Sequence, residues 1–186
     1  MALVDLIDAE RAPLLVAHLY ENGDPGPIAS ALAQVPELCE VALPFLGASL
    51  GPGATGVRLK ELVILRTSAR LECRYCVAAH TAVALDVGLG LDEVHALRDD
   101  DDLDAAFADP RERALLAWID AVATGRGPVP AGVTAAMRER FDDHEIVELT
   151  NCIGVTMLLN RFCTALDLPV GASVAERLTS EGFDIR

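Results

Sequence analysis

Apolar positions along most of this chain recur every three or four residues, which is the spacing of one face of an α-helix. In residues 57–71, positions 59, 62, 63, 66 and 69 follow this spacing, and Glu61 lies inside the apolar part. After Cys73 small residues are frequent up to Gly88, which suits the C-terminal end of a helix. We therefore expect two consecutive helices, from 57 to about 71 and from near 73 to about 88.

The same spacing predicts helices in most of the remaining chain. Pro36 suits the first turn of a helix, and Pro44 is expected to kink or break one. The further segments expected to be helical are an amphipathic stretch at about 3–20, one or two short helices within 27–50, and the ranges 91–98, 110–123, 131–141, 144–166 and the residues after 173.

Glycine, proline and acidic residues mark the expected connections between these helices. We interpret the acidic run 99–102 as a solvated connector and not as a calcium site, because no loop of oxygen ligands surrounds it. The Gly- and Pro-rich loops are expected at 22–27, 47–56, 125–132 and 168–171.

The composition favours a single all-α domain over residues 1–186. The chain has 186 residues, of which 52% are apolar, so it is long enough for one domain with a sizeable core. Aromatic residues make up only 4%, and the abundant Ala and Leu lose little entropy in a helix. The long apolar segment 144–166 predicts a central helix that could also take part in self-association.

Charge and cysteine usage limit the partners and the compartment. A net charge of -14 repels phosphate backbones and anionic lipid surfaces, so neither nucleic acid nor a membrane is expected as a partner. Residues 1–10 contain no basic segment followed by an apolar one, and no run of about 18 apolar residues is seen. Five cysteines do not form the frame of a small disulfide-rich protein. We therefore expect a soluble, cytoplasmic protein.

Cys73, Cys76 and His80 form the main candidate site. On a helix they occupy positions i, i+3 and i+7, which lie on one stripe. The positive end of the helix macrodipole stabilises a thiolate near the N-terminus, and Arg70 and Arg74 could add to this effect. By this argument Cys73 is the more acidic thiol.

Together with Glu61, these residues provide the groups that thiol-based reduction of a peroxide requires. One thiolate attacks, a second cysteine traps the sulfenic acid, and another group moves protons. A histidine titrates near pH 6.5, and burial disfavours the charged form of a carboxylate, so His80 and Glu61 suit proton exchange near neutrality. Each residue taken alone also fits a structural role, since isolated cysteines are commonly buried as small apolar residues.

Zinc binding is the competing use of two cysteines and a histidine. A helix rises about 1.5 Å per residue, so Cys73 and His80 are about 10 Å apart along its axis, whereas zinc ligands lie about 2.3 Å from the ion. Other ligands, such as His144 with Glu148 or Cys152, would have to approach from elsewhere in the chain. We expect no bound metal.

The remaining cysteines, Cys39, Cys152 and Cys163, lie in apolar helical segments. Helical rise separates Cys152 from Cys163 by about 16 Å, which is too far for a disulfide between them. All three are expected to be ordinary core residues without a special role.

The string KELVILRTSARLECRYCVAAH contains Glu61, eleven residues, Cys73, two residues, Cys76, three residues and His80. This motif, within a core at 57–88, resembles that of the AhpD-like group of the carboxymuconolactone decarboxylase superfamily. A looser likeness extends from about 36 to 168. The resemblance implies an all-α, AhpD-like helical bundle that forms a homo-oligomer, either a trimer or a hexamer.

For function, the resemblance implies a thiol-dependent hydroperoxide reductase. Cys76 would attack hydrogen peroxide or a small organic hydroperoxide, Cys73 would resolve the sulfenic acid to a disulfide, and Glu61 and His80 would relay protons. No cofactor would be bound. A dihydrolipoyl-bearing or thioredoxin-like donor protein, or another thiol reductant, would regenerate the dithiol.

Tyr75 departs from the pattern, because the better-known alkylhydroperoxidases carry a histidine between the two cysteines. A tyrosine has a pKa near 10 and cannot take up a proton near neutral pH. Two alternatives therefore stay open. One is a non-redox enzyme of the carboxymuconolactone decarboxylase type with Glu61 and His80 as acid and base, and the other is a helical oligomeric binding protein with vestigial thiols.

Overall fold

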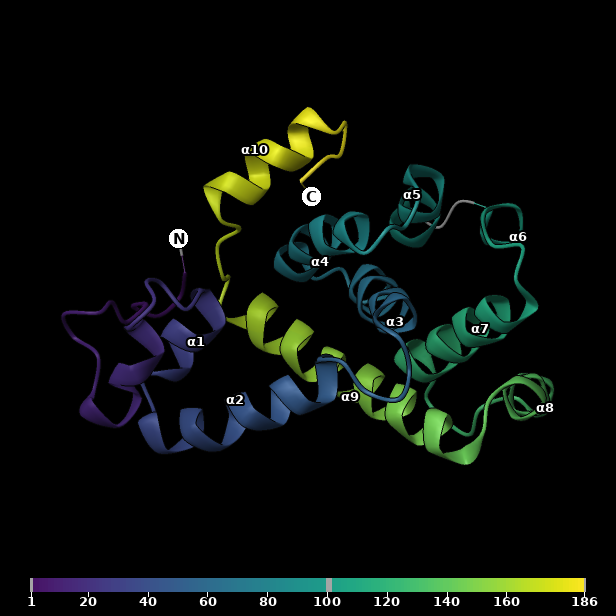
Figure 1. Cartoon of the computed structure of the whole chain (residues 1–186), viewed down its shortest axis with the longest axis horizontal. Coiled ribbons are helices and arrows are strands. Elements are labelled where there is room, and N and C mark those ends of the chain that lie inside the picture. Colours follow the sequence, from purple (N-terminus) through teal and green to yellow (C-terminus); the bar gives the residue numbers. More distant parts are fainter. Residues whose placement is uncertain (1, 100–101, 186) are drawn as a thin grey trace.

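The computed structural model describes residues 2–99 and 102–185, and all the regular structure within them is helical, as expected (Figure 1). The helices are η1, a 3-10 helix (Leu14–Tyr20), and the α-helices α1 (Pro27–Leu32), α2 (Pro36–Leu50), α3 (Val57–Arg70), α4 (Arg74–Asp86), α5 (Leu91–Asp99), α6 (Leu103–Ala106), α7 (Pro110–Thr124), α8 (Ala131–Arg140), α9 (Asp143–Ala165) and α10 (Ala172–Ser180).

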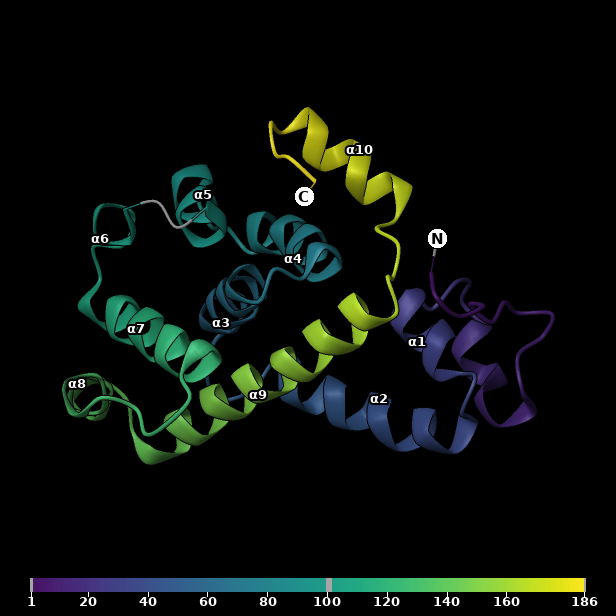
Figure 2. The same ribbon diagram turned by 180° about the vertical axis from the view of Figure 1, so that it is seen from behind.

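The long helix α9 is the centre of the fold, and α2, α3, α4, α7 and α8 all contact it. Figure 2 shows it running past α3 and α4, with α2 beside it. It begins with a capping box between Asp142 and Glu145, and Leu149 and Ile153 on its buried side are fully enclosed. By length and composition alone α9 would be able to cross a membrane, but its contacts are those of a core helix.

The pair α3 and α4 positions the candidate site. Residue Glu72 adopts a left-handed conformation with a φ of 54°, and the Cys73 amide donates to the Ser68 carbonyl at 3.0 Å. This Schellman-type ending closes α3 and makes Cys73 the N-cap of α4. Gly88, with a φ of 90°, follows the end of α4 as predicted.

Two buried cations connect α3 to its neighbours. Lys60 is 1% exposed and lies 2.8 Å from the carboxylate of Glu148 on α9. Arg66, also 1% exposed, makes a bidentate pair with Asp120 on α7 at 2.8 and 2.7 Å. Because a buried charge without a partner costs several kcal/mol, these pairs explain how polar residues occupy core positions of α3.

Three sequence predictions need correction. Only Leu14–Tyr20 of the stretch 3–20 is helical, because the preceding residues bond to distant carbonyls, as the Leu3 amide does to Leu166. Pro44 does not break α2, since Pro44 and Glu40 face solvent, where water can bond the carbonyl that lost its donor. The following loop therefore begins at Gly51, not at 47.

The acidic run 99–102 is described only in part. Asp99 belongs to α5, and the Asp102 side chain accepts from the Ala105 amide at the start of α6, a short helix that the sequence analysis did not predict. Positions 100 and 101 of the predicted connector lie outside the described residues.

Candidate active site

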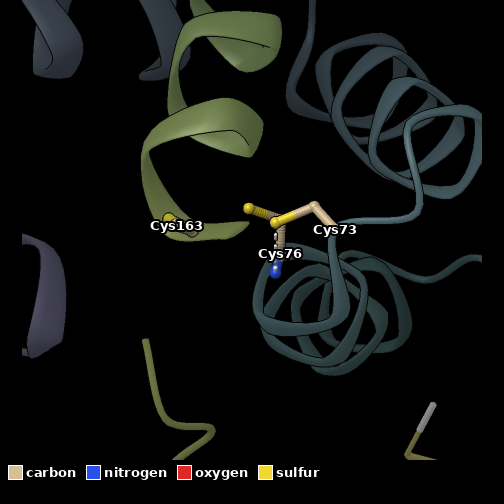
Figure 3. A group of neighbouring side chains, drawn as sticks. All are labelled: Cys73, Cys76 and Cys163. Atoms are coloured by element: carbon tan, nitrogen blue, oxygen red, sulfur yellow. Dashed lines mark hydrogen bonds between the residues drawn. The ribbon is translucent and has the colours of Figure 1, made fainter. Parts of the chain in front are cut away.

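Three thiols from two helices meet beside the start of α4. Cys73 is the N-cap of α4, Cys76 lies in its first turn, and Cys163 lies in the last turn of α9. Their sulfur atoms are all within 4.8 Å of one another. Figure 3 shows the Cys73 and Cys76 sulfurs on the side of α4 that faces the end of α9. All three side chains are buried, at 0%, 5% and 1% exposure respectively.

Cys163 is buried in the core as expected, but it lies beside the two cysteines of the predicted site and not apart from them. The end of α9 is fixed by a second Schellman-type turn, in which Asp167 has a φ of 48° and the Leu168 amide donates to the Cys163 carbonyl at 3.0 Å. Nothing in the local sequence marks Cys163, because its neighbours in the cluster are distant in the chain. Cys152 and Cys39, in contrast, pack in other parts of the core.

Hydrogen bonds within the cluster concentrate negative charge on Cys73. The thiols of Cys163 and Cys76 and the Cys76 amide, whose nitrogen is 3.4 Å from the Cys73 sulfur, lower the pKa of Cys73 to about 3, although burial opposes this. The order of acidity predicted from the helix macrodipole therefore agrees with the structure. Arg70 lies 3.7 Å from Asp120, so thiol and amide donors, not the expected arginines, are the main cause.

The other two thiols hold their protons more tightly. A hydrogen bond with Cys163 favours the charged form of Cys76, but its bond to Cys73 and its burial raise the pKa of Cys76 to about 12. Hydrogen bonds to Cys73 and Cys76, with burial, raise the pKa of Cys163 far above the usual range of a thiol. The three sulfurs thus share protons as one unit, with the first ionisation at Cys73.

Cys76 borders a small cavity, whereas Cys73 does not. The cavity has a volume of about 30 Å³, enough for a water molecule or a group of similar size. Two larger hollows, of about 470 and 500 Å³, contain none of the predicted site residues. The lining of the small cavity combines apolar side chains, such as Leu50, Ile64 and Leu159, with the polar groups of Cys76, His80 and Asn160.

His80 and Glu61 form a hydrogen-bonded pair at the same cavity. Nδ1 of His80 on α4 lies 2.9 Å from Oε2 of Glu61 on α3, and the Glu61 side chain is only 10% exposed. Because a carboxylate accepts, Nδ1 carries the hydrogen and Nε2 is left to exchange a proton. The four residues predicted from the sequence, Glu61, Cys73, Cys76 and His80, are therefore brought together on one side of α3 and α4.

Further polar residues line the cavity that the sequence analysis did not identify. Asn160 on α9 is 1% exposed and donates from Nδ2 to the hydroxyl of Ser68 at 3.0 Å, while its Oδ1 is buried with no hydrogen-bond partner within the described part of the chain. Tyr75 also borders the cavity, and burial raises its pKa to about 12, so it stays a neutral phenol. No motif marks Asn160, which only the packing of α9 against α3 brings to the site.

A metal ion could use the three thiols as sulfur ligands. The set Cys73, Cys76 and Cys163 differs from every zinc set considered from the sequence, because Cys163 replaces His80. Structural zinc is almost always held by four ligands in a tetrahedron. Within the described residues, the three thiols are the group of possible metal ligands that lie close together. A structural zinc site needs one ligand more.

Comparison with known proteins finds a family similarity over part of the chain. Residues 36–121 match the carboxymuconolactone decarboxylase family. No curated protein sequence matches the chain. An Agrobacterium tumefaciens protein of unknown function, for which an AhpD role in antioxidant defence has been suggested, is 25% identical with a TM-score of 0.69, over 76% of this chain and 96% of that one.

Two further solved structures share the fold over almost the whole chain. A peroxidase-related protein from Silicibacter sp. TM1040 is 19% identical, with a TM-score of 0.80 and 93% of each chain covered. The debrominase Bmp8, solved as its C82A variant with 2,3,4-tribromopyrrole, is 18% identical, with a TM-score of 0.75 and 97% of each chain covered. Residues 36–121 are therefore similar to the carboxymuconolactone decarboxylase family, and the chain as a whole shares the fold of AhpD-like proteins.

Proposed function

We propose that this protein is a thiol-dependent hydroperoxide reductase in which Cys76 is the attacking thiol and Cys73 resolves it. The observation that carries the proposal is that Cys76 borders a cavity shared with His80, while the Cys73 sulfur accepts a hydrogen bond from the Cys76 amide. Attack requires a sulfur that the peroxide can reach and a negative charge on the thiol cluster. Cys76 provides the access and Cys73 stabilises the charge.

The negative charge of the cluster rests mainly on Cys73, so attack passes through a minor state in which this charge has moved to Cys76. Transfer of the Cys76 proton to the Cys73 thiolate leaves a thiolate on the sulfur that faces the cavity. Its attack on the peroxide forms an S–O bond and breaks the O–O bond, and the departing oxygen takes a proton from His80, giving an alcohol or water and Cys76 sulfenic acid. Cys73 then loses its proton and attacks the Cys76 sulfur, which releases water and forms the Cys73–Cys76 disulfide.

The pair of His80 and Glu61 supports this proton transfer. The departing alkoxide or hydroxide is a strong base, so protonation as the O–O bond breaks lowers the barrier. Glu61 holds the imidazole at its Nδ1 and stabilises the charged imidazole before it gives up its proton. A non-redox reaction that used Glu61 and His80 alone would leave the cluster of thiols without a role.

The volume of the cavity favours small oxidants. A space of about 30 Å³ accommodates hydrogen peroxide, whereas an organic hydroperoxide would have to displace apolar side chains such as Leu159. The proposal includes regeneration of the dithiol by a dihydrolipoyl-bearing or thioredoxin-like donor, without a bound cofactor, and assembly of several copies of the chain. The resemblance to the AhpD-like group supports these two parts.

A free-thiol count tests the proposed function. Reduced protein treated with one equivalent of hydrogen peroxide should lose two of its five thiols and regain them with dihydrolipoamide. Cys76→Ser should lose none, whereas Cys39→Ser, at a buried thiol elsewhere in the core, should behave as wild type. Peroxide turnover that survives Cys76→Ser would exclude the proposal.

A further inference from the structure

We infer that Cys163 is a third redox-active thiol, which forms a disulfide with Cys76 when Cys73 does not. This inference rests on the proposed function, because it gives the oxidised Cys76 a second partner. It assigns a chemical role to a residue outside the CxxC motif and on a different helix.

The geometry of the cluster places Cys163, like Cys73, close to Cys76. The sulfur of Cys163 is within 4.8 Å of the other two. A disulfide bond is about 2.05 Å long, so bond formation requires the sulfurs to approach by about 2–3 Å. Cys76 and Cys163 lie in terminal turns of α4 and α9, where such a movement disturbs few helical hydrogen bonds.

The remaining cysteines do not share this geometry. Cys39 packs with α2 and η1 residues, and Cys152 packs in the main core between α3, α7 and α9. Neither belongs to the group of sulfurs around Cys76. Cys152 lies on the same helix as Cys163 and is fully buried, so it provides a matched control for a cysteine of α9 outside the cluster.

Formation of the Cys76–Cys163 disulfide needs no reagent other than the Cys76 sulfenic acid. Cys76 sulfenic acid reacts with the thiol of Cys163, which forms the Cys76–Cys163 bond and releases water. The same disulfide also arises by exchange: Cys163 gives up its proton to water, its sulfur attacks Cys76 in the Cys73–Cys76 disulfide, and Cys73 leaves as a thiolate. Cys73 is the better leaving group, since its thiolate is the most stabilised of the three.

Trypsin separates all of these pairs. Cleavage after Arg70, Arg74 and Arg161 places Cys73, Cys76 and Cys163 on three different peptides. Each disulfide therefore gives a cross-linked product of its own mass.

The decisive variant is Cys73→Ser. With excess hydrogen peroxide at pH 9 it should still lose two of its four remaining thiols and yield the peptide that joins Cys76 to Cys163, more slowly than wild type because Cys73 no longer stabilises the negative charge. Cys73→Ser/Cys152→Ser should do the same. Cys73→Ser/Cys163→Ser should lose only one thiol, and dimedone should then label the sulfenic acid on Cys76.

A parallel reaction and a control measurement keep this test independent of the proposed function and of folding. Because Cys73→Ser also removes the stabilised thiolate, diamide at pH 9 replaces peroxide in a parallel reaction and should give the same cross-link. Circular dichroism checks the fold of each variant.

The outcomes separate the two ideas. If wild type loses two thiols while Cys73→Ser stops at a dimedone-labelled Cys76 and diamide gives no Cys76–Cys163 peptide, the inference is wrong and the proposed function stands. If wild type loses no thiols to peroxide, the proposed function fails, and with it the redox role of Cys163.

Discussion

Nδ1 of His80 lies 2.9 Å from Oε2 of Glu61, and this contact joins α3 to α4 at the cavity that Cys76 borders. Residues 61 and 80 are on different helices, so the contact depends on how the two helices pack. It keeps the imidazole in one tautomer and one orientation, which a proton donor to a departing oxygen requires.

Replacement of this carboxylate should slow catalysis without loss of the fold. We expect Glu61→Gln to lower kcat/KM for hydrogen peroxide by about 100-fold, within the usual contribution of general acid–base catalysis. Stopped-flow measurement of thiol loss gives the rate. The control is Glu112→Gln, since Glu112 is a buried carboxylate of α7 paired with Arg58, away from the thiols. Equal rates for the two variants would argue against a proton relay.

The thiolate on Cys73 should depend on Cys163. Its folded pKa lies below the ordinary value of 9.0, so the thiolate persists as pH falls and is protonated only near the lowered value of about 3. Ultraviolet thiolate absorbance between pH 5 and 7 should report about one thiolate in wild type and none in Cys73→Ser. In Cys163→Ala, which lacks the largest stabilising hydrogen bond, the transition should move to higher pH. Cys152→Ala should titrate as wild type does, and an unchanged titration in Cys163→Ala would contradict the assigned cause.

The N-terminal segment should limit access to the thiols. Val4 and Leu6 pack against the apolar cluster in which Cys73, Cys76 and Cys163 lie together with Ala31 and Leu168. The Leu3 amide is bonded to the Leu166 carbonyl at 2.8 Å. We expect Val4→Ala/Leu6→Ala to react at least several-fold faster with a bulky aromatic disulfide reagent. Leu3→Ala removes a side chain that is 73% exposed and should not change this rate. Equal rates for the two variants would show that reagents reach the thiols by another path.

The ion pair of Lys60 and Glu148 should contribute to stability. The Lys60 side chain is 2% exposed and also donates to the Gly51 carbonyl at 2.5 Å, so it connects α3 to the loop after α2 and to α9. Lys60→Met should lower the free energy of unfolding by about 3 kcal/mol, because it leaves the partly buried Glu148 with only the Thr55 amide as a partner. Urea denaturation measures the loss. Arg11→Met, at an exposed pair with Asp8, should change stability by less than about 1 kcal/mol.

Much of this protein follows from local sequence. The spacing of apolar residues gives α3, α4, α7, α8 and α9 nearly to their ends, since one buried face imposes the helical period. The CxxC spacing and His80 four residues later likewise determine that these side chains lie on one side of α4, because helical geometry alone sets their directions.

The tertiary structure decided the rest of the site. Cys163 joins the two cysteines, and Asn160 reaches the cavity, only because α9 crosses the start of α4 at a particular place. The same applies to residues 3–13, which are not helical because their amides bond to partners such as Ser30 and Leu166. Contacts between segments far apart in the chain depend on how whole helices pack, and a local pattern of apolar and polar residues does not specify that packing.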